Sequence, residues 1–129
     1  MKISEKIKFK IDIKNITHIA KEIAKNKKVK AVYLFGSQAK GKTHIHSDVD
    51  ICIITESEAE DIAYHLTDNL DVSYFHNLPL IIQYRVLKEG RPLIVKDREF
   101  MHHITMKTLH DYIEFRPAIL RFIRETYNV

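Results

Sequence analysis

The sequence predicts an α/β (α+β) domain with a small mixed sheet flanked by helices. Short runs rich in β-branched residues alternate with segments whose apolar residues recur every three or four positions. The chain has 129 residues, 45% apolar and 29% charged, the balance of one soluble globular domain. Only 3 glycines and 3 prolines occur, which excludes collagen-like and loop-dominated architectures.

The N-terminal half contains three predicted strands. Residues 13–25 have apolar positions at helical spacing with lysines between them, whereas residues 2–12 fit either a helix or extended chain. The apolar run 29–35 predicts a strand that ends at a Gly-Ser turn. The segments that follow are a second strand, a helix and a third strand, at residues 49–54, 57–66 and 70–75.

The C-terminal half is mostly helical. A helix capped by Asn77, with Pro79 in its first turn, is expected to run to Glu89 and to stop at Gly90. Residues 93–95 form a short edge strand. Asp97 is a good N-cap for the long stretch after it, and Pro117 should kink or break that stretch into C-terminal helices.

The net charge of +4 is unevenly distributed. Residues 1–30 hold ten lysines and three acids, a balance of +7, so the remaining residues carry −3. A docking surface for an acidic partner would explain the lysines, but so would the solvated face of an amphipathic helix. Residues 1–30 contain no arginine and almost no aromatic residue, which argues against direct nucleic-acid binding.

The sequence also indicates the compartment. The single cysteine, Cys52, cannot form an internal disulfide, and no cysteine pair suggests a zinc site. No run approaches the roughly 18 apolar residues of a membrane span, and the N-terminus lacks the apolar core of a secretory signal. We therefore expect a cytoplasmic protein with no membrane contact.

Two carboxylates at the start of the second strand need an explanation. Asp48 and Asp50 are two positions apart, so a strand places both on one face, about 6.5–7 Å apart. They repel each other unless a cation lies between them, and hard oxygen ligands suit two magnesium or manganese ions. Asp71, at the start of the third strand, completes the cluster if those strands are neighbours in register.

The Gly-Ser turn strengthens this interpretation. Gly36 lets the backbone approach a phosphate closely, and the Ser37 hydroxyl and nearby amides can donate to phosphate oxygens. Each part alone is commonplace: a Gly-Ser pair is an ordinary turn, and an Asp-x-Asp pair is usually a solvated strand end. Together they predict a site for a nucleoside triphosphate and metal ions.

These motifs resemble those of the polymerase-β-like nucleotidyltransferase superfamily. Residues 36–41 (GSQAKG) and 47–50 (SDVD) match its signature, and residues 87–93 and 111–112 resemble its minimal nucleotidyltransferase (MNT) branch. The resemblance covers roughly residues 29–127. It implies one nucleotidyltransferase domain over 1–129, consisting of a lysine-rich helical segment (1–28), a catalytic core (29–96) and C-terminal helices (97–129).

The resemblance also implies roles for individual residues. Asp48 and Asp50 would bind two magnesium ions, and Asp71 would be a third ligand that also deprotonates the acceptor hydroxyl. Gly36 and Ser37 would hold the phosphates of ATP. Family members often have an arginine after the Gly-Ser pair, where this chain has Gln38, so Lys40 or Lys42 would supply the positive charge.

Many members of the MNT branch are antitoxins encoded beside a HEPN-domain ribonuclease toxin. The resemblance therefore implies an antitoxin that transfers AMP from ATP to a tyrosine hydroxyl of its toxin and so silences it. Two alternatives stay open: a non-catalytic antitoxin that inhibits by binding, and a nucleotidyltransferase for small molecules such as aminoglycosides. The sequence does not decide the acceptor, the base preference or whether the protein is a homo-oligomer.

Overall fold

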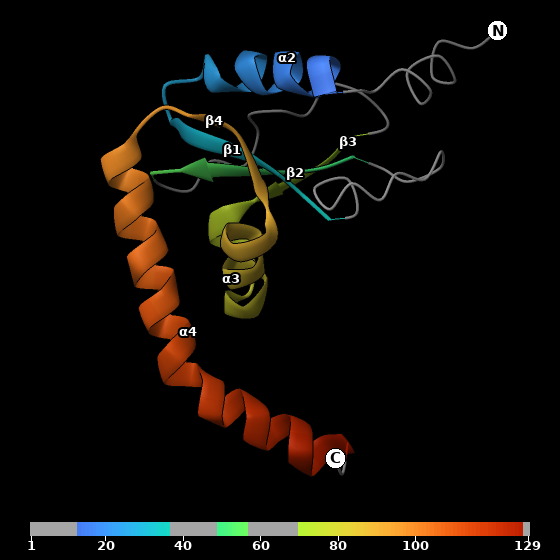
Figure 1. Cartoon of the computed structure of the whole chain (residues 1–129), viewed down its shortest axis with the longest axis vertical. Helices are drawn as coiled ribbons and strands as arrows, with labels where there is room; N and C mark the ends of the chain where they lie inside the picture. Colours follow the sequence, from blue (N-terminus) through green and yellow to red (C-terminus); the bar gives the residue numbers. More distant parts are fainter. Residues whose placement is uncertain (1–12, 37–48, 57–69, 128–129) are drawn as a thin grey trace, which may run out of the picture.

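The chain folds into three layers, seen in the computed structural model of residues 13–36, 49–56 and 70–127 (Figure 1). Helix α2 (Ile13–Ala24) covers one face of a four-stranded sheet, and α3 (Leu80–Glu89) and α4 (Arg98–Tyr127) lie on the other. The strands are β1 (Val29–Phe35), β2 (Val49–Thr55), β3 (Leu70–Tyr74) and β4 (Arg91–Val95).

The sheet is mixed, as predicted, with strand order β3-β2-β1-β4. Strand β1 is antiparallel to both β2 and β4, whereas β2 and β3 are parallel. Because helices cover both faces of the central strands, β1 and β2 are apolar runs rather than alternating ones. The expected α+β fold is therefore confirmed, and β4 is an edge strand as expected.

Helix α2 forms at the predicted position and packs through its apolar side. Ile16, Ala20 and Ile23 are buried against the sheet, and Lys21 is exposed to solvent. The end of α2 is held by the edge strand, since Lys96 Nζ donates to the carbonyls of Ala24 (2.6 Å) and Asn26 (3.1 Å). The bond to Ala24 satisfies a carbonyl group that the helix leaves unpaired at its C-terminus, whereas the Asn26 carbonyl also accepts the Val29 N–H at 3.1 Å.

The expected start of α3 is wrong by a few residues. Asn77 does not cap this helix but ends a short 3₁₀ helix, η1 (Phe75–Asn77), and Pro79 occupies the N-cap position without a side-chain bond. The reason is Phe75, which is 1% exposed and turns the chain sharply into the core. The Gln83 side chain donates to the Phe75 carbonyl at 2.9 Å and so ties η1 to α3.

Helix α4 begins as predicted and bends, as expected for a stretch that contains a proline. Asp97 Oδ1 accepts the Phe100 N–H at 3.0 Å, and this bond, with Lys30 at 3.5 Å, lowers the pKa of the Asp97 carboxyl. Pro117 lies inside one 30-residue helix that bends without breaking (Figure 1), so of the two expected outcomes, a kink or a break, the kink is found. Proline removes one helical hydrogen bond, and at this exposed position water can satisfy the orphan carbonyl.

Several expectations fall outside the described residues. They are the ambiguous segment 2–12 and the expected helix at 57–66. Among the helices that the structure describes, none is both long and apolar enough to cross a membrane.

Candidate active site at the end of the central strands

The sheet brings two of the predicted acids together. Asp50 on β2 is the register partner of Asp71 on the parallel strand β3. Residues paired in this way point to the same face, and neighbouring strands lie about 4.8 Å apart. The two carboxylates are 21 positions apart in sequence, yet they are adjacent at this end of the sheet. The Asp71 side chain is exposed, and Asp50 is half-buried.

Gly36 lies directly against this pair. It follows Phe35, which is the register partner of Asp50 on the other side of β2. Gly36 has a φ of +81°, the left-handed region that favours glycine. A Cβ at this position would lie 3.3 Å from Asp50 Cγ and would collide with Asp50 Oδ2. The glycine therefore provides both the turn after β1 and the room that the Asp50 carboxylate occupies.

The acids lie on the sheet face that α3 and α4 cover. Cys52 and Ile54 follow Asp50 on the same side of β2 and are buried among residues of these helices. Burial raises the pKa of the Cys52 thiol to about 12, so at neutral pH this sulfur stays protonated. Cys52 is therefore a small buried residue of the core, with its thiol in the unreactive protonated form.

A cavity of about 250 Å³ opens beside Gly36. Phe35 and Ile82 form apolar walls, while Arg85 and Glu89 on α3 provide a cation and an anion. Arg85 Nε donates to Glu89 Oε2 at 3.1 Å, and the Arg85 side chain is 56% exposed. Nothing in the sequence marks these two residues as part of a site. An i,i+4 Arg/Glu pair is typical of any solvated helix, and only the fold places α3 next to the end of β1.

The other predicted site residues lie outside the described part of the chain. They are Asp48, Ser37, Lys40 and Lys42, together with Gln38. The described part of the site is thus Gly36, Asp50 and Asp71 with the adjoining cavity.

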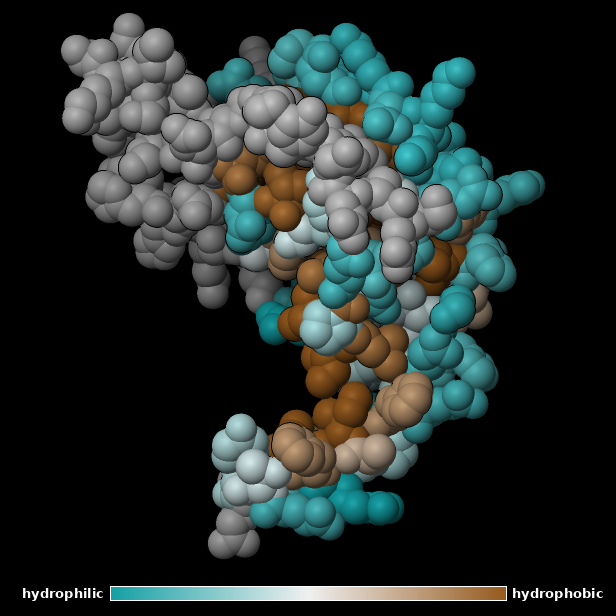
Figure 2. Space-filling model, turned by 180° about the vertical axis from the view of Figure 1, so that it is seen from behind, coloured by the Kyte–Doolittle hydropathy of each residue, from teal (hydrophilic) through white to brown (hydrophobic). Residues whose placement is uncertain are grey.

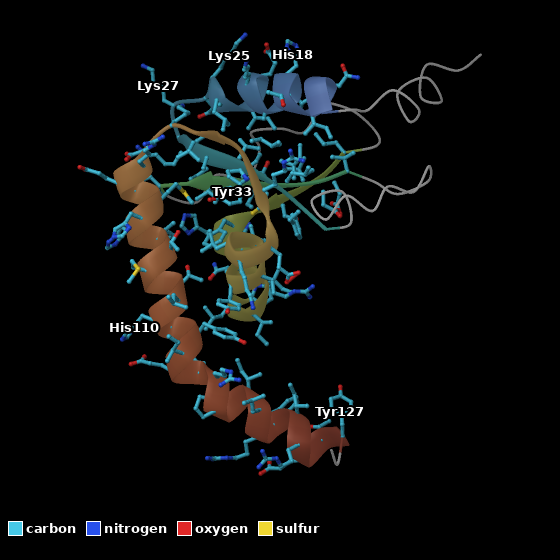
Figure 3. All side chains as sticks on the ribbon, in the orientation of Figure 1. His18, Lys25, Lys27, Tyr33, His110 and Tyr127 are labelled. Carbon is cyan, nitrogen blue, oxygen red and sulfur yellow. The ribbon has the colours of Figure 1, made fainter. Side chains whose placement is uncertain are left out.

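The described donors fit a hard divalent cation. Asp50 and Asp71 offer anionic oxygens from adjacent strands, which is the ligand chemistry that magnesium and manganese prefer. A second acidic group lies on α4, where ligand atoms of His110, Asp111 and Glu114 come within 4.8 Å of one another. His110 is on the outer side of that helix (Figure 3), and Lys107 binds Asp111 at 2.9 Å, so a surface ion-pair network explains the group.

Sequence comparison relates most of the described chain to a known family. Residues 15–99 match the family described as "Polymerase beta, Nucleotidyltransferase". A protein of Methanocaldococcus jannaschii, named "Putative protein adenylyltransferase", is 30% identical over 78 residues. That match covers 59% of this chain and 64% of the relative, so it spans slightly less than two thirds of the relative's length.

Structural comparison finds the same fold in toxin–antitoxin complexes. A chain of a toxin–antitoxin crystal structure with AMP-PNP has a TM-score of 0.73 at 19% identity, covering 91% of this chain and 99% of that one. A chain from the complex of a tri-AMPylated Shewanella oneidensis HEPN toxin with its MNT antitoxin has a TM-score of 0.66 at 15% identity, covering 95% and 98%. At these identities the likeness shows the fold.

Proposed function

The chain belongs to the polymerase beta nucleotidyltransferase family, and we propose that it transfers AMP from ATP to a tyrosine hydroxyl of a partner HEPN-domain toxin. The transfer neutralises the toxin, so the protein acts as an antitoxin in the cytoplasm. The register pairing of Asp50 with Asp71 beside Gly36 is the observation that carries this proposal. The adenylyltransferase name of the relative and the AMPylated toxin in a neighbouring structure support it.

The two described acids have different positions and therefore different proposed roles. Asp50 is half-buried and packed against Gly36. It would hold magnesium together with Asp71 and with Asp48, which lies outside the described residues. When bound, magnesium neutralises triphosphate charge and stabilises the leaving pyrophosphate. Asp71 is exposed at the edge strand β3, where an acceptor can approach it. It would accept the proton of the tyrosine hydroxyl.

The proposed transfer is a single displacement at the α-phosphorus of ATP. The tyrosine oxygen forms a bond to the α-phosphorus of ATP as its proton moves to Asp71. The bond from the α-phosphorus to the bridging oxygen breaks, and pyrophosphate leaves. The chain's contribution is to orient the hydroxyl and the triphosphate for in-line attack, as in other phosphoryl transfers.

Intact mass spectrometry of the toxin tests the proposal. The HEPN-domain protein encoded beside this chain's gene is incubated with this protein, magnesium and ATP, and its mass should rise by whole AMP units. An unchanged toxin mass in a stable complex would contradict transfer and indicate inhibition by contact alone. AMP transfer to an aminoglycoside instead would identify a small-molecule enzyme.

Arg85 supplies a further prediction about the nucleotide. Its guanidinium lines the cavity beside Gly36, so it is placed to bind a phosphate oxygen, the role expected of Lys40 or Lys42. Arg85→Ala should raise the KM for ATP roughly 10-fold, with a smaller change in kcat, because a hydrogen bond to a charged group contributes about 1.5–3 kcal/mol. Arg85→Lys should raise the KM for ATP less than Arg85→Ala does. Initial rates over a range of ATP concentrations measure both constants.

Arg98→Ala is the matched control, because it removes an exposed arginine at the start of α4. Its KM for ATP should equal that of the unaltered protein. An Arg85→Ala protein with an unchanged KM would exclude a role for this residue in nucleotide binding.

A further inference from the structure

The C-terminal half of α4 carries an apolar surface that nothing in the described structure covers. We refer to residues 113–127 as the tail, a helical segment about 22 Å long. The tail extends beyond the end of α3 (Figure 1). Six of its large apolar side chains are between 38% and 68% exposed: Ile113, Phe115, Leu120, Phe122, Ile123 and Tyr127. Figure 2 shows a brown surface along the hollow between the body and the end of the chain.

The spacing of these residues shows that the surface continues the buried side of the helix. Met101, Thr108, Phe115 and Phe122 follow one another at intervals of seven, so they lie along one side of α4. The first two are buried against the body, at 6% and 3% exposed, whereas Phe115 and Phe122 are 56% and 64% exposed. The helix thus carries its packing side past the point where the body ends.

A second apolar line runs about 140° around the helix from the first. Met106, Ile113, Leu120 and Tyr127 are also spaced by seven, and all four are at least 43% exposed. The last packing between the body and this helix includes the stack of Tyr84 on Tyr112, with ring centroids 3.8 Å apart. Beyond Tyr112 the two lines are the edges of an apolar face that takes in Ile119 and Ile123 and about half the circumference of the helix. This face is too extensive for the scattered exposed residues of an ordinary surface.

We propose that this tail face docks the acceptor protein, presenting its tyrosine on the side of the sheet where the acids lie. The inference rests on the proposed function. Asp50, Asp71, α3 and the tail all lie on one side of the sheet, so a protein seated on the tail faces the reacting groups. Aromatic residues and arginine are enriched where interfaces hold most of their binding energy, and the tail combines both.

The charges of the tail define the chemistry of the partner. Arg116, Arg121 and Arg124 outnumber Glu114 and Glu125, so the tail favours an apolar surface with acidic groups at its border. A second copy of this chain fits less well. Antiparallel pairing centred on Leu120 would place Arg116 opposite Arg124, and parallel pairing would place each arginine opposite itself.

Charge insertion into the tail face tests the inference. Leu120→Asp and Phe122→Asp should each weaken binding of the adjacent-gene HEPN-domain protein about 30-fold or more, measured by isothermal titration calorimetry without nucleotide. His103→Asp is the control, because it introduces the same charge on the outer side of α4 and should change the affinity less than threefold. Helix content and Tm of all three proteins should match those of the parent chain, because the replaced side chains are exposed.

The possible results separate this inference from the proposed function. Normal affinity in both tail variants would overturn the docking surface, even if the parent chain transfers AMP. If the tail variants lose affinity and the parent chain transfers no AMP, the docking surface is supported and the proposed enzymatic activity is contradicted. Light scattering of the parent chain and of Phe122→Asp shows whether the chain dimerises through the tail. A dimer that is lost in Phe122→Asp would identify a second copy as the occupant and would overturn the proposed one.

Discussion

Asp50→Asn should abolish AMP transfer, lowering kcat/KM by about 10³-fold, while leaving the fold intact. The substitution keeps the shape of the side chain and removes one anionic oxygen from the pair that Asp50 forms with Asp71. Ligands of a catalytic metal contribute several kcal/mol to the transition state, and each 1.36 kcal/mol corresponds to a tenfold change in rate. Like charges on adjacent strands repel each other, so losing one should cost little stability. Pyrophosphate release and thermal unfolding measure the two effects.

Glu56→Gln is the matched control for this experiment. Glu56 follows the other end of β2, is exposed and forms an ion pair with Lys30 at 3.8 Å. The Glu56→Gln substitution removes the same charge directly after the other end of β2 without touching the site, so turnover should be unchanged. Normal turnover by Asp50→Asn would show that the register pair is not the catalytic centre.

Gly36→Ala should damage both the site and the stability of the turn. The backbone there has a φ of +81°, which costs a residue with a Cβ about 1–2 kcal/mol. The added methyl group would also press on the Asp50 carboxylate and displace it. A displacement of about 1 Å at a reacting group can cost about 100-fold in rate, so we expect a loss of that order in kcat. Denaturant unfolding and the AMP-transfer rate report on the two consequences separately.

Gly36→Asn distinguishes strain from collision. Asparagine tolerates the left-handed region better than alanine, so its stability loss should be smaller. Its Cβ meets the same carboxylate, so its loss of activity should be as large as that of alanine. Full activity in both variants would show that the close approach of Gly36 to Asp50 has no catalytic importance.

Most secondary structure could be predicted because local patterns determine it. Strand β1 was expected at residues 29–35 and occurs there, and the Asp97 cap of α4 was predicted from a single side chain. The error in the start of α3 arose where a distant contact outweighs local preference, because burial of Phe75 moves the start of this helix beyond Asn77. At Pro117, where a kink or a break was expected, the helix bends and stays continuous.

The candidate site divides in the same way. Asp50, Asp71 and Gly36 were selected from residue type and spacing, but only conditionally, because a sequence does not state which strands are neighbours. The parallel pairing of β2 with β3 brings the two acids together. Arg85 and Glu89 gave no usable signal, since an Arg/Glu pair four residues apart is common on solvated helices.

By itself the sequence determined the elements, the family signature and the chemical types at the site, because these depend on neighbouring residues and on spacing along the chain. Tertiary structure alone decided the strand order, the approach of Gly36 to Asp50 and the cavity beside it, because these require segments far apart in sequence to pack together. It also decided which half of α4 is covered. Large side chains recur every seven residues through both halves of this helix. Phe115 and Phe122 are exposed because the rest of the domain ends before it reaches them.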